Sequence, residues 1–119
     1  MIKPDKKAIR RAYKLRPPDR GIYQIRNLAS GKAFIGRAMD LNGKLNSERF
    51  QLKNGMHANR ELQKDYDKLG EKAFAFQVLD RLAPKEGAGD PGPELKALEE
   101  LWLETLRPFG ERGYHGGKG

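Results

Sequence analysis

Short apolar runs alternate along the chain with stretches rich in charged residues and glycine. Two extended runs, 21–27 and 32–36, are joined by four residues that include a glycine, which is typical of a β-hairpin. A third run, 73–79, alternates apolar side chains between its two sides and is therefore predicted to form a strand. The pattern predicts three short strands, with the first two adjacent in the sheet.

Helical spacing of apolar residues fills most of the remaining chain. A glycine follows the segment 41–53, and Asn59 is placed to cap the segment 60–69. The segment 94–106 has the clearest helical pattern, whereas 84–93 is rich in glycine and proline and is expected to be a loop. Together with a short helix over 5–15, this order predicts a small sheet with helices packed against it.

Length and composition restrict the class of protein. A chain of 119 residues is one domain in size, and the lack of cysteine excludes disulfides and thiolate metal sites. The longest apolar-rich run is far shorter than the roughly 20 residues of a membrane span, and the first residues lack the apolar core of a secretory signal. We therefore expect a cytoplasmic protein and exclude membrane-spanning and secreted classes.

Positive charge is concentrated near the start of the chain. The sequence has 24 basic and 16 acidic residues, a net charge of +8, and residues 1–20 hold eight basic against two acidic residues. A polyanion is the ordinary partner of such a segment, although a solvated basic helix has the same composition. The residues predicted to contact nucleic acid there are Lys6, Lys7, Arg10, Arg11 and Lys14.

One carboxylate is out of place in the helix predicted over 94–106. Projected as a helix, the segment has an apolar face that includes Leu95, Leu98 and Trp102, and Glu99 falls in the middle of that face. A carboxylate among core-facing residues needs a cation or hydrogen-bond donors. Two interpretations stay open: a salt bridge to an Arg or Lys of the sheet, or a ligand of Mg²⁺, which one carboxylate with phosphate and water can hold.

The hairpin carries a pair of motifs. Gly-Ile-Tyr at 21–23 is followed, after ten residues, by Phe-Ile-Gly at 34–36, and this pair resembles the motifs of the GIY-YIG nuclease family. The resemblance extends over residues 20–115, because the segments 41–57, 59–66 and 74–76 and the position of Glu99 also fall in family register.

The resemblance implies both a fold and a chemistry. It implies an α+β domain over 21–115, with a three-stranded antiparallel sheet flanked by helices, preceded by a basic helix within 1–20 and followed by a flexible tail, 116–119. It also implies hydrolysis of DNA phosphodiesters with one divalent ion, Mg²⁺ or Mn²⁺. Tyr23 would help to activate the attacking water, and Glu99 would bind the metal ion.

Several positions depart from the family pattern. Phe34 stands where the second motif has a tyrosine, Lys44 occupies the position of the catalytic arginine, and Glu48 that of a histidine. Lysine keeps the positive charge without the bidentate grip of arginine, and Glu48, four residues later on the same helix, can pair with Lys44 and mask it. A small bacterial branch of the family that carries lysine at this position resembles the chain.

Three further residues complete the candidate site. Arg37 follows the second motif and could hold phosphate or pair with Glu99, and His115 occupies the place of a family asparagine. His57 lies at a helix entrance, where it could form local hydrogen bonds or contact nucleic acid. With only two histidines, a histidine-cluster metal site is excluded.

The sequence thus predicts a DNA-binding domain of GIY-YIG type with metal-dependent endonuclease activity and an altered active site. Two alternatives stay open. The domain could bind DNA without cleaving it, or it could be a basic protein-interaction domain in which Glu99 only forms an ion pair.

Overall fold

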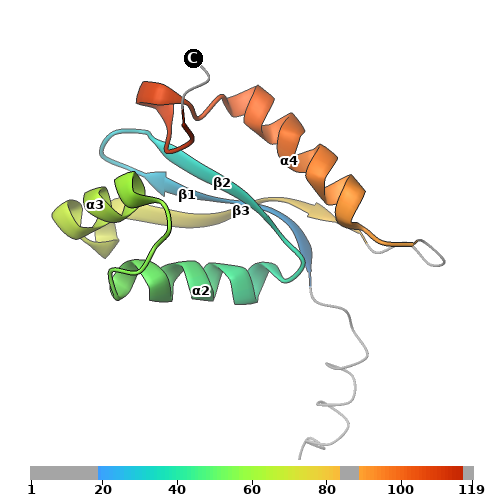
Figure 1. Cartoon of the computed structure of the whole chain (residues 1–119), viewed down its shortest axis with the longest axis horizontal. Helices are drawn as coiled ribbons and strands as arrows, with labels where there is room; N and C mark the ends of the chain where they lie inside the picture. Colours follow the sequence, from blue (N-terminus) through green and yellow to red (C-terminus); the bar gives the residue numbers. More distant parts are fainter. Residues whose placement is uncertain (1–18, 84–88, 117–119) are drawn as a thin grey trace, which may run out of the picture.

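A three-stranded antiparallel sheet forms the centre of the computed structural model, which describes residues 19–83 and 89–116. Strand β1 (Arg20–Asn27) lies between β2 (Ala33–Ala38) and β3 (Phe74–Leu82) and pairs antiparallel with both (Figure 1). The predicted hairpin and the predicted α+β class are confirmed. The basic segment expected to form a helix over 5–15 lies outside the described residues.

Helices cover both sides of this sheet. Helices α2 (Leu41–Lys53) and α3 (Arg60–Leu69) lie on one side, and α4 (Gly92–Leu106) lies on the other (Figure 1). The side chain of Asp40 accepts a hydrogen bond at the start of α2, and that of Asn59 does so at the start of α3. The bounds of α2 and α3 agree with those expected from the sequence.

Three elements extend by two or more residues beyond their predicted ends. Strand β2 continues to Ala38 and β3 to Leu82, because both strands stay paired with β1 although their last residues include charged side chains. Helix α4 begins at Gly92, within the predicted loop, since Pro93 lies in the first turn, where a helix does not need the missing amide hydrogen.

The alternation of side chains along β1 divides the core into two layers. Tyr23 and Ile25 point toward α2 and α3 and pack with the leucines of those helices. Ile22 belongs to the opposite face, where Leu95 of α4 is also buried. Leu106 is exposed because it lies in the final turn of α4.

The segment 113–115 covers the outer edge of β2. The main-chain nitrogen of Tyr114 donates to the carbonyl of Ala33, and that of Ile35 donates to Nε2 of His115. The phenol of Tyr114 is itself held between Asn27 and Asp65. His115 is also held by its main-chain nitrogen, which donates to the carbonyl of Pro108; residues 117–119 lie outside the described part.

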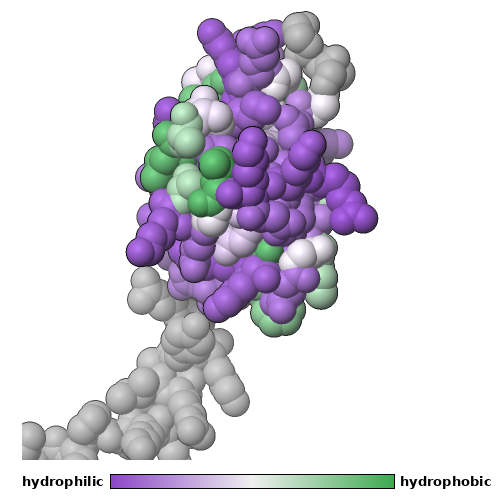
Figure 2. Space-filling model, turned by 90° about the vertical axis from the view of Figure 1, so that its left-hand side faces the viewer, coloured by the Kyte–Doolittle hydropathy of each residue, from purple (hydrophilic) through white to green (hydrophobic). Residues whose placement is uncertain are grey.

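The surface of the described part is largely polar. Figure 2 shows one face, covered mainly by hydrophilic residues with a smaller hydrophobic patch to one side. Within 19–83 and 89–116 there are 15 basic and 14 acidic residues, so most of the excess positive charge belongs to the first 18 residues. No helix of the described part is long and apolar enough to cross a membrane.

Candidate active site

The two motifs of the hairpin meet through a glycine. Tyr23 of β1 lies directly across from Gly36 of β2, and a Cβ built on Gly36 would lie 2.5 Å from the phenol oxygen. The ring of Tyr23 therefore occupies the space that any side chain at this position would fill. The last residue of the second motif has to be glycine because the tyrosine of the first motif packs against it.

A second glycine allows close pairing of β1 with β3. A Cβ on Gly21 would overlap the main chain of Asp80, and the register between these strands shifts between Ile22 and Tyr23. The extra residue is Leu79 of β3, which has no partner in β1, so the pairing changes register just before Tyr23. Both glycines of the motif pair thus position the tyrosine.

Tyr23 is almost fully buried, and its surroundings disfavour the phenolate. Burial contributes most to raising the pKa of Tyr23, followed by the charge of Glu48 and its hydrogen-bonding oxygens, and then by the charge of Glu99. The phenol therefore stays protonated at neutral pH. The two carboxylates act on Tyr23 from opposite layers, since Glu48 belongs to α2 and Glu99 to α4.

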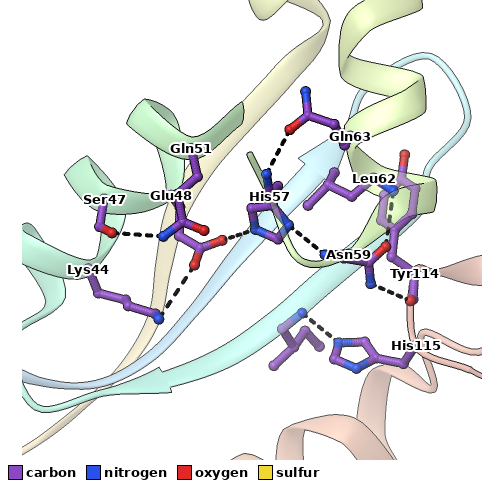
Figure 3. A network of polar contacts seen from close by, with 11 residues as sticks. Lys44, Ser47, Glu48, Gln51, His57, Asn59, Leu62, Gln63, Tyr114 and His115 are labelled. Carbon is purple, nitrogen blue, oxygen red and sulfur yellow. Dashed lines mark hydrogen bonds and ion pairs between the residues drawn. The ribbon is translucent and has the colours of Figure 1, made fainter. Parts of the chain in front are cut away.

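Glu48 is a buried carboxylate with a cation on one oxygen and a histidine on the other. Its side chain is 4% exposed; Oε1 lies 3.5 Å from Nζ of Lys44 and Oε2 lies 2.5 Å from Nε2 of His57 (Figure 3). The predicted pairing of Lys44 with Glu48 is confirmed. The contact of this carboxylate with His57 was not predicted.

His57 is fixed by its neighbours. Its main-chain nitrogen donates to Oε1 of Gln63, and its Nδ1 accepts from the main-chain nitrogen of Asn59, both at 3.0 Å (Figure 3). Because Nδ1 is an acceptor, the proton of a neutral ring is on Nε2 and is donated to Glu48. The interpretation of His57 as a nucleic-acid contact is corrected: the residue is buried, and both ring nitrogens are engaged within the protein.

Phe34 lies at the centre of an aromatic cluster. Its ring is stacked on His115 with centroids 5.1 Å apart, meets His57 edge-on at 5.4 Å and lies 6.4 Å from Tyr23. Burial lowers the pKa of His115, against the opposing charge of Glu99, and the amide hydrogen of Ile35 occupies Nε2 of its ring. A neutral imidazole thus covers the aromatic ring of the second motif.

Glu99 of α4 forms an ion pair with Arg37 of β2. Oε1 of Glu99 lies 2.8 Å from Nη1 of Arg37, and the two side chains are 19% and 47% exposed. The salt bridge to the sheet, one of the two interpretations of Glu99, is the arrangement present. The described part of the chain has no group of three or more potential metal ligands, but a single carboxylate with phosphate and water fits Mg²⁺.

The structure brings most of the predicted site residues to β2 and its neighbours. Tyr23, Phe34, Lys44 and Glu48 gather on the α2 side of this strand, whereas Arg37 and Glu99 lie on the α4 side. The predicted contacts from the basic segment are outside the described residues; they are Lys6, Lys7, Arg10, Arg11 and Lys14.

Comparison with solved structures identifies the fold. The chain is similar to the catalytic domain of the homing endonuclease I-TevI, with a TM-score of 0.67 and 24% identity, over 84% of this chain and 99% of that one. A single-site mutant of the same domain, described as from an intron endonuclease, gives a TM-score of 0.63 and 24% identity over 75% and 84% of the two chains. No protein-family model and no curated protein matches the sequence. The chain therefore has the GIY-YIG fold.

Proposed function

We propose that the protein is a metal-dependent DNA endonuclease that hydrolyses phosphodiester bonds. The observation that carries the proposal is the phenol of Tyr23, held over Gly36 by a fold shared with an endonuclease catalytic domain. Two carboxylates, Glu48 and Glu99, act on this phenol from the two sides of the sheet. Such a set of groups is suited to moving a proton beside a bound phosphate.

Each group has a role in this proposal. Tyr23 would take a proton from the attacking water. Glu99 would hold Mg²⁺ or Mn²⁺, and the ion supplies a Lewis acid for the phosphate oxygens. Arg37 and Lys44, on opposite sides of β2, provide positive charge that would meet the negative charge developing on the phosphate.

Plasmid nicking tests the proposal directly. The protein is incubated with supercoiled plasmid and Mg²⁺ or Mn²⁺, beside a Glu99→Ala variant. Glu100→Ala is the matched control, because it removes an exposed carboxylate from the neighbouring position of the same helix. We expect nicking by the wild type and the control, and a loss of about 10²–10³-fold in Glu99→Ala. Nicking that does not depend on Glu99 would contradict the assigned role.

The ion pairs of the site favour one alternative, a domain that binds DNA without cleaving it. Lys44 and Arg37 each have a carboxylate partner within the protein, so neither cation is fully available to a phosphate. In that case the wild type and Glu99→Ala would bind DNA equally well, and both would leave the plasmid supercoiled.

DNA binding itself depends on the distribution of charge. The described residues are close to neutral, whereas residues 1–18 have a net charge of +6, with seven basic residues and one acidic residue. We expect affinity to fall with salt by about 0.9 logarithmic units per neutralised phosphate for each tenfold rise. Replacing Lys6, Lys7, Arg10 and Arg11 with glutamine should flatten this slope. No binding at low salt would instead favour a basic protein-interaction domain.

A further inference from the structure

A hollow lies on the α4 side of the sheet, between the end of this helix and the turn that joins β1 to β2. Its volume is about 320 Å³, and it is lined by Gln24 and Ala33 of the two strands and by Leu106, the last residue of α4. The turn and the segment after α4 lie at the same end of the molecule (Figure 1). No residue assigned to the candidate active site lines this hollow, so it is a separate feature.

Two arginines from distant parts of the sequence line the hollow. Arg26 belongs to β1, and Arg112 belongs to the short 3₁₀ helix η2 (Gly110–Arg112) that follows α4. Ala33 links them, because it lies directly across from Arg26 in the sheet and forms a bridge with Gly113. Since neighbouring strands are about 4.8 Å apart, the main chains at Arg26 and Gly113 are about 10 Å apart. Two arginine side chains can reach a common ligand over that distance.

The main chain that carries Arg112 is fixed by its neighbours. A Cβ built on Gly113 would overlap the main chain of Pro108, so only glycine allows the close approach at this point. The main-chain nitrogen of Arg112 donates to the carbonyl of Phe109. The side chain of Arg112 is exposed on this fixed segment, as is that of Arg26 on β1.

Neither arginine has an anionic partner within 19–83 and 89–116. Arg81 and Arg107 show the usual arrangement, in which an exposed arginine forms an ion pair with a carboxylate. In the described part of the chain, no ion pair or side-chain hydrogen bond is formed by Arg26 or Arg112. Glu111 is the only carboxylate among the described residues that line the hollow, and one carboxylate cannot neutralise two guanidinium groups. The excess positive charge attracts an anion.

The donors of the hollow suit a phosphate group. A guanidinium has a planar set of donors that matches two oxygens of a phosphate, and it stays charged at every pH of interest. The side-chain amide of Gln24 adds a further donor group, since its Nε2 has two hydrogens and donates one of them to Gln77. Because the proposed substrate is DNA, the phosphate is one of the DNA backbone.

The hollow lies on the same side of the sheet as Glu99. Paired residues of neighbouring strands share a face, so Arg26 lies on the face of Ala33, which is also the face of Arg37, four residues along β2. Four residues of a strand span about 13 Å. Glu99 and Leu106 are seven residues apart on α4, which is about 10 Å. Since DNA rises by about 3.4 Å per nucleotide of one strand, either distance corresponds to about three to four nucleotides.

We propose that Arg26 and Arg112 together bind one phosphate of the DNA backbone, about three to four nucleotides from the phosphate that Glu99 and its metal ion would hold. This inference rests on the proposed nuclease function and adds to it a second contact with DNA. The contact positions the DNA on the α4 side of the sheet and takes no part in the chemistry.

The salt dependence of DNA binding tests the site. Fluorescence anisotropy of a labelled duplex, without metal, gives the dissociation constant over a range of salt for Arg26→Gln, Arg112→Gln and the double variant. Loss of one phosphate contact lowers the slope by about 0.9, and loss of hydrogen bonds to a charged group weakens binding by about 10–100-fold. We expect both effects in the double variant. An unchanged slope would overturn the site, and a decrease of about 1.8 would overturn the sharing of one phosphate.

Arg60→Gln is the matched control. Arg60 is exposed at the start of α3, on the other side of the sheet, and within the described residues it forms no ion pair. The control should bind DNA with the affinity and slope of the wild type. A decrease as large as that of the double variant would overturn the assignment to the hollow.

Lysine variants separate a defined site from diffuse attraction. Arg26→Lys and Arg112→Lys keep the positive charge but lack the planar set of donors. We expect a slope close to that of the wild type with weaker binding at every salt concentration. Binding as tight as that of the wild type would show that charge alone acts, which would overturn the proposal.

Nicking kinetics separate the hollow from the reacting centre. A contact that holds the substrate and the transition state equally changes KM and leaves kcat unaffected. We expect the Arg26→Gln, Arg112→Gln double variant to have a raised KM for plasmid, whereas Glu99→Ala loses kcat. A loss of kcat with an unchanged KM in the double variant would overturn the positioning role.

The two proposals fail in different ways. Nicking that depends on Glu99, together with an unchanged salt slope in the double variant, would overturn the phosphate site and leave the nuclease in place. Wild-type nicking no faster than that of Glu99→Ala, together with a lower slope in the double variant, would overturn the nuclease and support the phosphate site as a DNA contact. A wild type that binds no DNA at low salt would overturn both.

Discussion

Each side of strand β2 has a carboxylate that contacts a side-chain nitrogen, but one pair is buried and the other is exposed to solvent. On the α2 side, Glu48 and His57 are 4% and 3% exposed. On the α4 side, Glu99 and Arg37 are 19% and 47% exposed. A pair closed off from water has its partners fixed by the fold, whereas a pair open to water can exchange its partner for a ligand. This difference is the reason that we propose proton transfer on the α2 side and metal binding on the α4 side.

The largest effect is expected from breaking the closed pair. His57→Ala leaves the carboxylate of Glu48 buried with only Lys44 at 3.5 Å. Leaving a buried charged group without a hydrogen-bond donor costs at least about 1–3 kcal/mol, and deleting the ring adds the cost of a cavity. Urea unfolding should show a loss of this size, and a Glu48→Leu, His57→Leu double variant should be more stable than His57→Ala. A loss below about 1 kcal/mol, which is the range for exposed ion pairs, would contradict the difference in environment between the Glu48 pair and the Glu99 pair.

The next effect concerns Gly36, which lies in β2 between the two sides. In Gly36→Ala the new methyl group meets the phenol of Tyr23, and overpacking of this kind costs about 1–3 kcal/mol. We expect nicking to fall to the level of Glu99→Ala. Gly116→Ala is the control, because nothing lies within 4 Å of a Cβ at that position. Full activity of Gly36→Ala would show that the position of the phenol is not critical.

A smaller effect on stability is expected on the open side. Arg37→Gln removes an exposed ion pair, which is worth about 0–1 kcal/mol. The same change frees Glu99, so Mn²⁺ should bind more tightly, as measured by calorimetry on protein without DNA. Weaker Mn²⁺ binding in Arg37→Gln would mean that the arginine supports the metal site instead of competing with it.

The smallest effect is a pH dependence of stability from His115. Since burial lowers its pKa, the unfolded chain binds a proton more readily than the folded protein. The contribution of His115 to the free energy of unfolding is therefore present above the ordinary histidine pKa of about 6.5, and it is lost as the pH falls below that value. His115→Asn should flatten the decline of Tm between neutral and mildly acid pH. If Tm declines identically in both proteins, other titratable groups cause the decline.

Most of the fold was predictable because the hairpin motifs and helix caps are local signals. The apolar periodicity located all three strands, but it ended β2 and β3 early, since pairing with β1 continues each strand past a charged residue that interrupts the apolar run. The segment 113–115 was missed for a related reason. Its contacts join residues about 80 positions apart, and no local pattern indicates them.

The site was predicted unevenly. Glu99 was found because it interrupts an apolar helical face, and Glu48 presents the same signal: it is buried in series with Leu41, Leu45 and Leu52 of α2. That spacing was available in the sequence. The partner of Glu48 could not be read from this spacing, because His57 lies beyond the end of the helix. Only the turn between α2 and α3 brings its ring to the carboxylate.

The covered edge of β2 also affects how the domain can associate. An open edge strand offers its amide and carbonyl groups to other chains and so invites aggregation through added strands. Here the carbonyl of Ala33 and the amide of Ile35 are already bonded to the segment 113–115. A neighbouring chain therefore cannot pair with residues 33–35 of β2 without displacing this segment. Strand addition is left to β3, the other outer strand of this sheet.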